Sequence, residues 1–230
     1  MKVIYEDNHL IIVNKSSGEI VQGDKTGDKP LSEMLKEYIK DHYAKPGEVF
    51  LGVVHRLDRP VSGLVVFART SKALARMNAL ISEREVKKTY WAIVKGCPAK
   101  PEGHLINYLW KNESQNKSYI VTEDKKGALR AELKYKVLAK SKDYSLLEVN
   151  LLTGRHHQIR VQLSAIGCTI RGDLKYGYSR SNPDGSINLH ARQIEFIHPV
   201  KQTPFSIKAI PPNERMWNIF KEIMGPEVDE

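Results

Sequence analysis

The chain has 230 residues, of which 41% are hydrophobic and 27% are charged, values that are typical of a folded globular domain and argue against a disordered or collagen-like chain. Its longest apolar runs are far shorter than the ~18 residues that cross a bilayer, and no signal-peptide pattern opens the sequence, so we expect a cytoplasmic protein without a membrane segment. The 36 lysines and arginines outnumber the 27 acidic residues, for a net charge of +9, which favours a polyanionic partner such as nucleic acid.

Hydrophobic periodicity predicts the secondary structure in chain order. We expect strands over residues 1–13 with a turn at 6–8, a helix from Leu31, a strand over 63–68, a helix capped by Ser71, and strands over 88–94, 104–110, 118–122, 130–138 and 145–151. A helix with Ile159, Leu163 and Ile166 on one face then follows Gly154, before strands over 187–198 and 205–209 and a helix over 214–223. Strands outnumber helices and neighbouring strands are spaced like hairpins, which indicates an α+β domain with a largely antiparallel sheet.

The densest polar cluster between apolar runs is His-Arg-Leu-Asp-Arg at residues 55–59. Polar groups between two core strands must be hydrogen-bonded, solvated or functional. If Arg56 or Arg59 lies close to Asp58, its guanidinium favours the ionised carboxylate, which can act as a nucleophile or a base. The alternative is an aspartate that caps the turn before Pro60 or forms a structural ion pair.

A second cluster, Thr-Gly-Arg-His-His-Gln-Ile-Arg, occupies residues 153–160. Helical spacing allows Arg160 to point away from the apolar face. Between residues 154 and 182, basic and aromatic side chains are mixed in the pattern that suits single-stranded RNA, namely Arg155, Arg160, Arg171, Lys175, Arg180, Tyr176 and Tyr178. A solvated basic face is the alternative. Neighbouring His156 and His157 diverge on a helix and have no acid or cysteine at ligand spacing, so we expect no metal site.

A third candidate is Tyr90, which is followed by Trp91 in a predicted strand. Strand alternation buries one of these two aromatic residues. The alternative to a catalytic tyrosine is a core tyrosine with a hydrogen-bonded hydroxyl. The sequence holds no GxxxxGK[ST], GxGxxG or GxSxG motif, so NTPase, dinucleotide-binding and common esterase functions have little support.

Several of these motifs, in this order, resemble those of the RluA-type pseudouridine synthases. The residues similar to the family are 55–59 with 62–64, 88–92, 154–155 with 157–160, 172–173 with 176–177, 189–191, and 196 with 198–199. The resemblance covers about residues 5–210, and Ser16, Val61 and His156 depart from the usual pattern. We therefore expect a single catalytic domain over residues 1–230, without the N-terminal RNA-binding module of many relatives.

The resemblance implies a mixed, mainly antiparallel sheet flanked by helices, with RNA in a central cleft. It implies an enzyme that isomerises specific uridines to pseudouridine in structured ribosomal or transfer RNA, as a monomer and without a cofactor or metal. By motif position Asp58 is the nucleophile and Arg160 its ionic partner, while Tyr90 stacks on the target base or takes part in proton removal at C5.

The target uridine must leave the RNA stack to react, and by the resemblance Arg56 fills the vacated space. The remaining family positions either bind RNA or brace the active-site loop, and these are His55, Arg155, His157 and Gln158. A non-catalytic RNA-binding protein or chaperone of the same fold is the main alternative. A glycosidase needs two carboxylates beside the bond, and the two clusters offer only Asp173 as a second acid.

Overall fold

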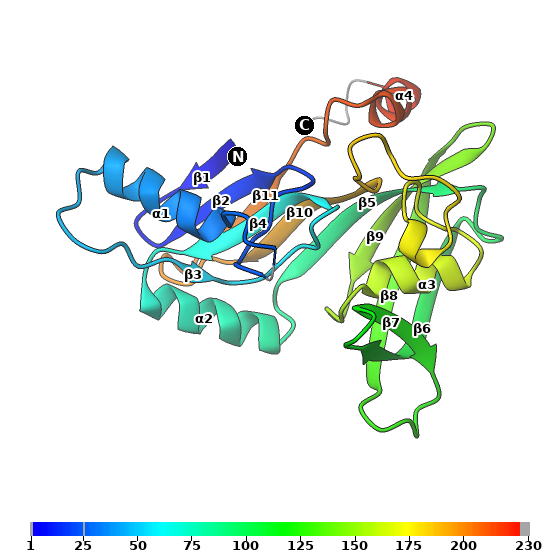
Figure 1. The fold of residues 1–230 in the computed structure, drawn as a ribbon, viewed down its shortest axis with the longest axis horizontal. Coiled ribbons are helices and arrows are strands. Elements are labelled where there is room, and N and C mark those ends of the chain that lie inside the picture. The colour runs from blue at the N-terminus through cyan, green and yellow to red at the C-terminus, as the bar shows by residue number, and fades with distance from the viewer. Residues whose placement is uncertain (1, 25, 226–230) are drawn as a thin grey trace.

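The computed structural model describes residues 2–24 and 26–225. They form β1 (Lys2–Glu6), β2 (Leu10–Lys15), α1 (Leu31–His42), β3 (Gly52–Val53), β4 (Ser62–Ala68), α2 (Ser71–Ser82), β5 (Lys87–Lys95), β6 (Glu102–Asn112), β7 (Lys117–Val121), β8 (Leu129–Lys140), β9 (Tyr144–Leu151), α3 (Gln158–Ala165), the short 3₁₀ helix η1 (Leu174–Tyr176), β10 (Leu189–Ile197), β11 (Pro204–Lys208) and α4 (Arg215–Met224). All the strands join one sheet, which runs β1-β2-β4-β10-β5-β9-β8-β6-β7, with β3 beside β4 and β11 beside β10 (Figure 1).

The sheet is mixed but almost wholly antiparallel. Among the paired strands of the described residues, only β4 and β10 run parallel, and Gly63 lies opposite Ala191 there. Gly63 has φ +114°, and a Cβ atom at this position would lie 2.4 Å from the Ala191 carbonyl oxygen. Glycine is therefore the residue that lets the two backbones approach. The predicted α+β class with a mixed, mainly antiparallel sheet is confirmed.

Helices α1 and α2 explain why β4 is apolar on both faces. Leu31, Leu35 and Ile39 of α1 pack on one set of β2 and β4 residues, which includes Val65 and Phe67. Ala73 and Met77 of α2 belong to the core on the opposite face, with Leu64 and Val66. Because both faces of β4 are covered, all seven of its residues are buried.

The same arrangement corrects the prediction for β5, where both aromatic residues are buried. Tyr90 belongs to the large core that also contains α2 and the α3 residue Ile159. Trp91 points to the other face and packs against Trp217 and Phe220 of α4. Since the sheet is covered on both sides here, strand alternation places the two rings in different cores instead of exposing one of them.

Two predicted helix starts are wrong by a few residues. Thr70 rather than Ser71 caps α2, because the Thr70 hydroxyl accepts the Ala73 N–H at 3.1 Å. Helix α3 begins at Gln158, so His156 and His157 precede it and do not diverge as they would on a helix; their rings stack with centroids 3.7 Å apart. His157 has a left-handed backbone with φ 54°.

Candidate active site

The loop between β3 and β4 carries Asp58, and Lys15 of β2 holds the backbone of this loop through hydrogen bonds. The Lys15 side chain is 1% exposed, and its ammonium group donates hydrogen bonds to the carbonyl oxygens of Ser16 at 2.9 Å, Arg59 at 3.1 Å and Val61 at 2.7 Å. The Val61 N–H closes a turn on the Asp58 carbonyl at 3.0 Å. The buried Lys15 ammonium group thus fixes the backbone on both sides of Pro60. The sequence motifs did not indicate this role.

Arg160 of α3 holds the Asp58 side chain from the far side of the loop. Its Nη1 donates to Asp58 Oδ2 at 2.9 Å, while its Nε and Nη2 donate to the two oxygens of Asp173 at 2.7 Å and 2.8 Å. The arginine and Asp173 are buried, whereas 31% of the Asp58 side chain is exposed. Bidentate pairing fixes the guanidinium plane, so Asp173 orients the arginine that orients Asp58.

The predicted cluster at 153–160 therefore contacts Asp58, and the arginine that makes the contact is Arg160. Arg59 instead pairs with Asp28, and Arg56 is exposed. The ion pair of Asp58 is thus made with Arg160, the partner that the family resemblance implied, and not with either of the neighbouring arginines.

His157 and Tyr176 complete the contacts around the carboxylate. His157 Nε2 lies 3.4 Å from Asp58 Oδ2, and its Nδ1 lies 2.9 Å from the Tyr176 hydroxyl. Burial, followed by the nearby Arg160 charge, lowers the pKa of His157 to about 2, so the ring is neutral at physiological pH. The Tyr176 ring also lies under the Arg160 guanidinium at 5.1 Å.

Tyr90 of β5 faces the same carboxylate. Burial first, and then the Asp58 charge, raise the pKa of Tyr90, so its hydroxyl is protonated at neutral pH. This hydroxyl makes no hydrogen bond within residues 2–24 and 26–225. Tyr90 is therefore a core residue whose hydroxyl has no hydrogen-bond partner among the described residues.

Two residues predicted to contact RNA or brace the loop have their polar atoms turned inward. His55 Nε2 accepts the Val66 N–H at 3.3 Å, and burial, followed by the Lys88 charge, lowers the pKa of His55 to about 3. The side-chain amide of Gln158 donates to the Glu132 carbonyl at 3.0 Å, and its oxygen accepts the Thr153 hydroxyl at 2.8 Å. Both side chains brace the site.

The basic and aromatic segment at 154–182 is also largely structural. Arg155 Nε donates to the Arg130 carbonyl at 3.0 Å, and Arg171 donates to Asn182 and Asn188 at 2.7 Å and 2.8 Å. Tyr176 is buried, and its hydroxyl accepts the Ser118 N–H at 2.9 Å. Lys175 and Arg180 are exposed. Contact of this segment with single-stranded RNA stays a prediction.

A buried histidine makes the fold sensitive to acid. His190 is fully buried between Ser62 and the Ala209 carbonyl, and burial lowers its pKa from 6.5 to about 3. Below pH 6.5 the unfolded chain binds a proton that the folded chain does not. We therefore expect the free energy of unfolding to fall, through this group alone, by about 1.4 kcal/mol per pH unit between pH 6.5 and 3.

The measurement is urea unfolding as a function of pH. Replacing His190 by Gln should reduce the proton uptake on unfolding by one, whereas the same change at exposed His42 serves as the control and should leave the slope as it is. An unchanged slope in His190→Gln would contradict this assignment.

The described residues contain no group of three or more His, Cys, Asp or Glu side chains that could hold a metal ion. No helix in that part of the chain is both long and apolar enough to cross a membrane. Two surface cavities lie away from Asp58, one on the β6–β7 hairpin and one between α2 and the turn that joins β10 to β11.

Comparison with known proteins decides the family. A model of the RNA pseudouridylate synthase family matches residues 9–165, more than half of the chain. The chain belongs to that family. It is 32% identical to the ribosomal large subunit pseudouridine synthase D of Zymomonas mobilis, over 97% of this chain and 73% of that protein. It is 33% identical to the ribosomal large subunit pseudouridine synthase C of Vibrio vulnificus, over 96% of this chain and 69% of that protein.

The fold of this pseudouridine synthase is shared with a solved relative. The structure of human RNA pseudouridylate synthase domain containing 4 matches with a TM-score of 0.78, over 97% of this chain and 92% of that chain, at 24% identity. The expected RluA-type family, its fold and its isomerase activity on RNA are thus confirmed. The departures Ser16, Val61 and His156 lie in loops around Asp58, and His156 contacts the β7 residue Ser118 through its carbonyl at 2.7 Å.

Proposed function

We propose that Asp58 is the nucleophile of this pseudouridine synthase and that its substrate is ribosomal RNA, the substrate class printed in the names of two relatives. The arrangement of the two Asp58 oxygens carries the proposal. Oδ2 is paired with Arg160, whereas Oδ1 accepts no hydrogen bond within the described residues. A carboxylate held by one oxygen and open at the other is oriented for attack.

The reaction conserves every atom of the uridine. The Asp58 carboxylate attacks the nucleoside and the C1′–N1 bond breaks. The base then turns and rejoins the ribose through C5, and the bond to Asp58 breaks to release the carboxylate. A proton leaves C5 and one is gained at N1, so no oxidant or reductant is needed. Arg160 holds the carboxylate through the cycle, and Asp173 and Lys15 hold Arg160 and the loop. We further propose that the enzyme works as a cytoplasmic monomer and without a metal.

Tyr90 and Arg56 are proposed to contact the RNA directly. A protonated Tyr90 hydroxyl is a poor proton acceptor, so its position beside Asp58 supports contact with the face of the target base over proton removal from C5. Arg56 lies on the same loop two positions before Asp58, and its side chain is exposed. It is therefore free to occupy the space from which the uridine is extruded.

The test is pseudouridine mapping of total RNA from cells without the gene, complemented either by wild type or by Asp58→Ala. We expect at least one site to disappear on deletion and to return only with wild type. A site in ribosomal RNA would support the substrate, and a site in another RNA class would replace it.

The second candidate, a non-catalytic RNA-binding protein, makes a different prediction. Asp58→Ala would then restore every effect of the deletion, because binding does not require the carboxylate. Equal rescue by wild type and Asp58→Ala, with no pseudouridine formed by either purified protein, would overturn the nucleophile assignment.

A further inference from the structure

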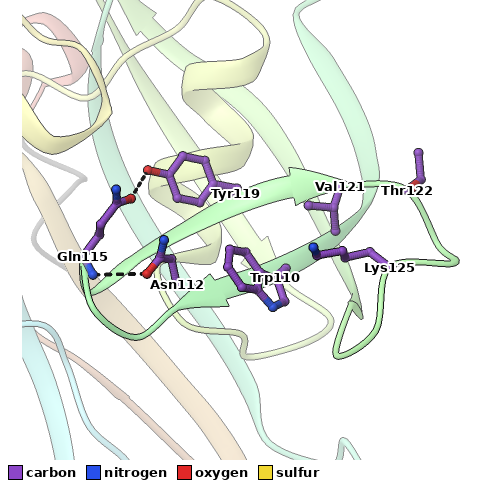
Figure 2. Close-up of a pocket in the computed structure, with 7 residues that line it drawn as sticks. All are labelled: Trp110, Asn112, Gln115, Tyr119, Val121, Thr122 and Lys125. Carbon is purple, nitrogen blue, oxygen red and sulfur yellow. Dashed lines mark hydrogen bonds between the residues drawn. The ribbon is translucent and has the colours of Figure 1, made fainter.

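A cavity of about 580 Å³ lies on the β6–β7 hairpin, outside the cluster around Asp58 (Figure 2). Trp110 and Tyr119 lie opposite each other on the paired strands and supply its aromatic surface. Its other lining residues are Asn112, Gln115, Val121, Thr122 and Lys125. The cavity thus has one charged lining residue, which is basic, and no acidic one.

The polar groups around the aromatic pair are mainly hydrogen-bond donors. The ammonium group of Lys125 lies 5.0 Å from the Trp110 ring centroid. The side-chain oxygens of Asn112 and Gln115 already accept bonds from Gln115 N–H and the Tyr119 hydroxyl. Their NH₂ groups donate to no partner within the described residues. An aromatic platform with free donors and a cation suits a flat ring that carries carbonyl oxygens and a phosphate.

The hairpin connects this cavity to the active site. Ser118 of β7 faces α3 and bonds Tyr176 and His156, and the next residue, Tyr119, points to the opposite face and lines the cavity. Lys117 lies between the two, since its ammonium is 5.4 Å from the Tyr119 ring centroid and 5.2 Å from that of Tyr176. Tyr176 in turn contacts Arg160 and His157. A ligand in the cavity is therefore held at a fixed position relative to Asp58.

We propose that this cavity binds an unpaired nucleotide of the RNA substrate, next to but distinct from the target uridine. The base stacks on Trp110 and Tyr119, the amide groups of Asn112 and Gln115 donate to its carbonyl oxygens, and Lys117 and Lys125 contact the backbone phosphates. The inference rests on the RNA synthase activity, and it adds a second recognition site to the single domain.

The test is the affinity of purified variants for a fluorescein-labelled single-stranded oligouridylate, measured by anisotropy. Trp110→Ala should weaken binding about 5- to 100-fold, the range of alanine substitutions at base-stacking residues. Trp110→Phe keeps a stacking ring and should retain most of the affinity. Tyr108→Ala is the matched control, because Tyr108 lies on the same face of β6 but does not line the cavity, and it should change affinity less than about 2-fold.

Thermal unfolding of each variant separates a binding defect from a folding defect. Because the bases of a duplex are paired, a duplex RNA of the same length should bind with equal affinity to wild type and Trp110→Ala. Equal losses of affinity in Trp110→Ala and Tyr108→Ala, or no loss in either, would overturn the proposal. The cavity would then be open to another occupant, such as a protein segment or a second copy of this chain. The binding measurement needs no turnover. Failure of wild type to form pseudouridine would contradict the catalytic proposal, whereas unchanged binding by Trp110→Ala would contradict this one, so the two failures are distinguishable.

Discussion

Asp58→Asn is expected to reduce pseudouridine formation at least about 10⁴-fold, a loss of the size seen when a nucleophile is removed. Asparagine keeps the shape of the side chain but replaces the negative oxygen with a neutral amide, which is a far weaker nucleophile. The substitution leaves Arg160 paired with Asp173 through both of its remaining nitrogens, so we expect the fold to persist. The assay is release of tritium from RNA labelled at uridine C5, under single-turnover conditions.

The matched control is Asp28→Asn. Asp28 is an exposed aspartate that pairs with Arg59 of the same loop, and an exposed ion pair contributes little free energy. This variant should retain nearly all the activity. If Asp58→Asn keeps more than about 1% of the wild-type rate, a level incompatible with loss of the nucleophile, Asp58 acts only as a positioning group and another residue must attack the uridine.

Gly63→Ala is expected to lower the free energy of unfolding by more than about 4 kcal/mol, which is at the far end of single substitutions. The added Cβ would lie 2.4 Å from the Ala191 carbonyl oxygen and 2.5 Å from the Ala191 nitrogen. Both atoms belong to the backbone of β10, so no rotamer change can relieve the contact. The strands must separate at the parallel pair that also holds Ser62 against His190. Urea unfolding measures the loss.

The control for backbone strain is Gly18→Ala. Gly18 also has a positive φ, +86°, but an added Cβ would meet nothing within 4 Å. That variant should lose only the ~1–2 kcal/mol of a left-handed alanine. Equal losses at the two positions would show that φ alone, and not the close approach of β4 and β10, makes glycine necessary at residue 63.

Local pattern was enough to predict most strands and helices, because alternation and helical spacing are properties of short segments. It failed where tertiary contacts decide. Both Tyr90 and Trp91 are buried because α4 covers the second face of β5, and the sequence does not say where a distant helix will pack. The pairing of Asp58 with Arg160 was expected from motif order and not from spacing, since the two residues lie 102 positions apart.

The residues that support Asp58 were harder to predict than Asp58 itself. Asp173 was noted as an acid and as part of the motif at 172–177, without a partner, and Lys15 was given no role. Both are buried charged groups whose partners are remote in the chain or are backbone carbonyls. A buried charge must be paired or hydrogen-bonded, but a sequence does not show which charges are buried. For the same reason the sequence did not show that Arg155 and Arg171 bond to other parts of the protein.

The parallel pairing of β4 with β10 has a consequence for the order of events during synthesis. Ser62, just after the loop that carries Asp58, is backed by His190, which lies 128 positions later. Domains generally acquire their structure as the required segments leave the ribosome. A nascent chain that ends before β10 lacks the strand that backs this loop and the close pairing of β4 with β10 that Gly63 permits. The backing of the Asp58 loop is therefore complete only after β10 has been synthesised, so most of the chain must be made before this loop has its final support.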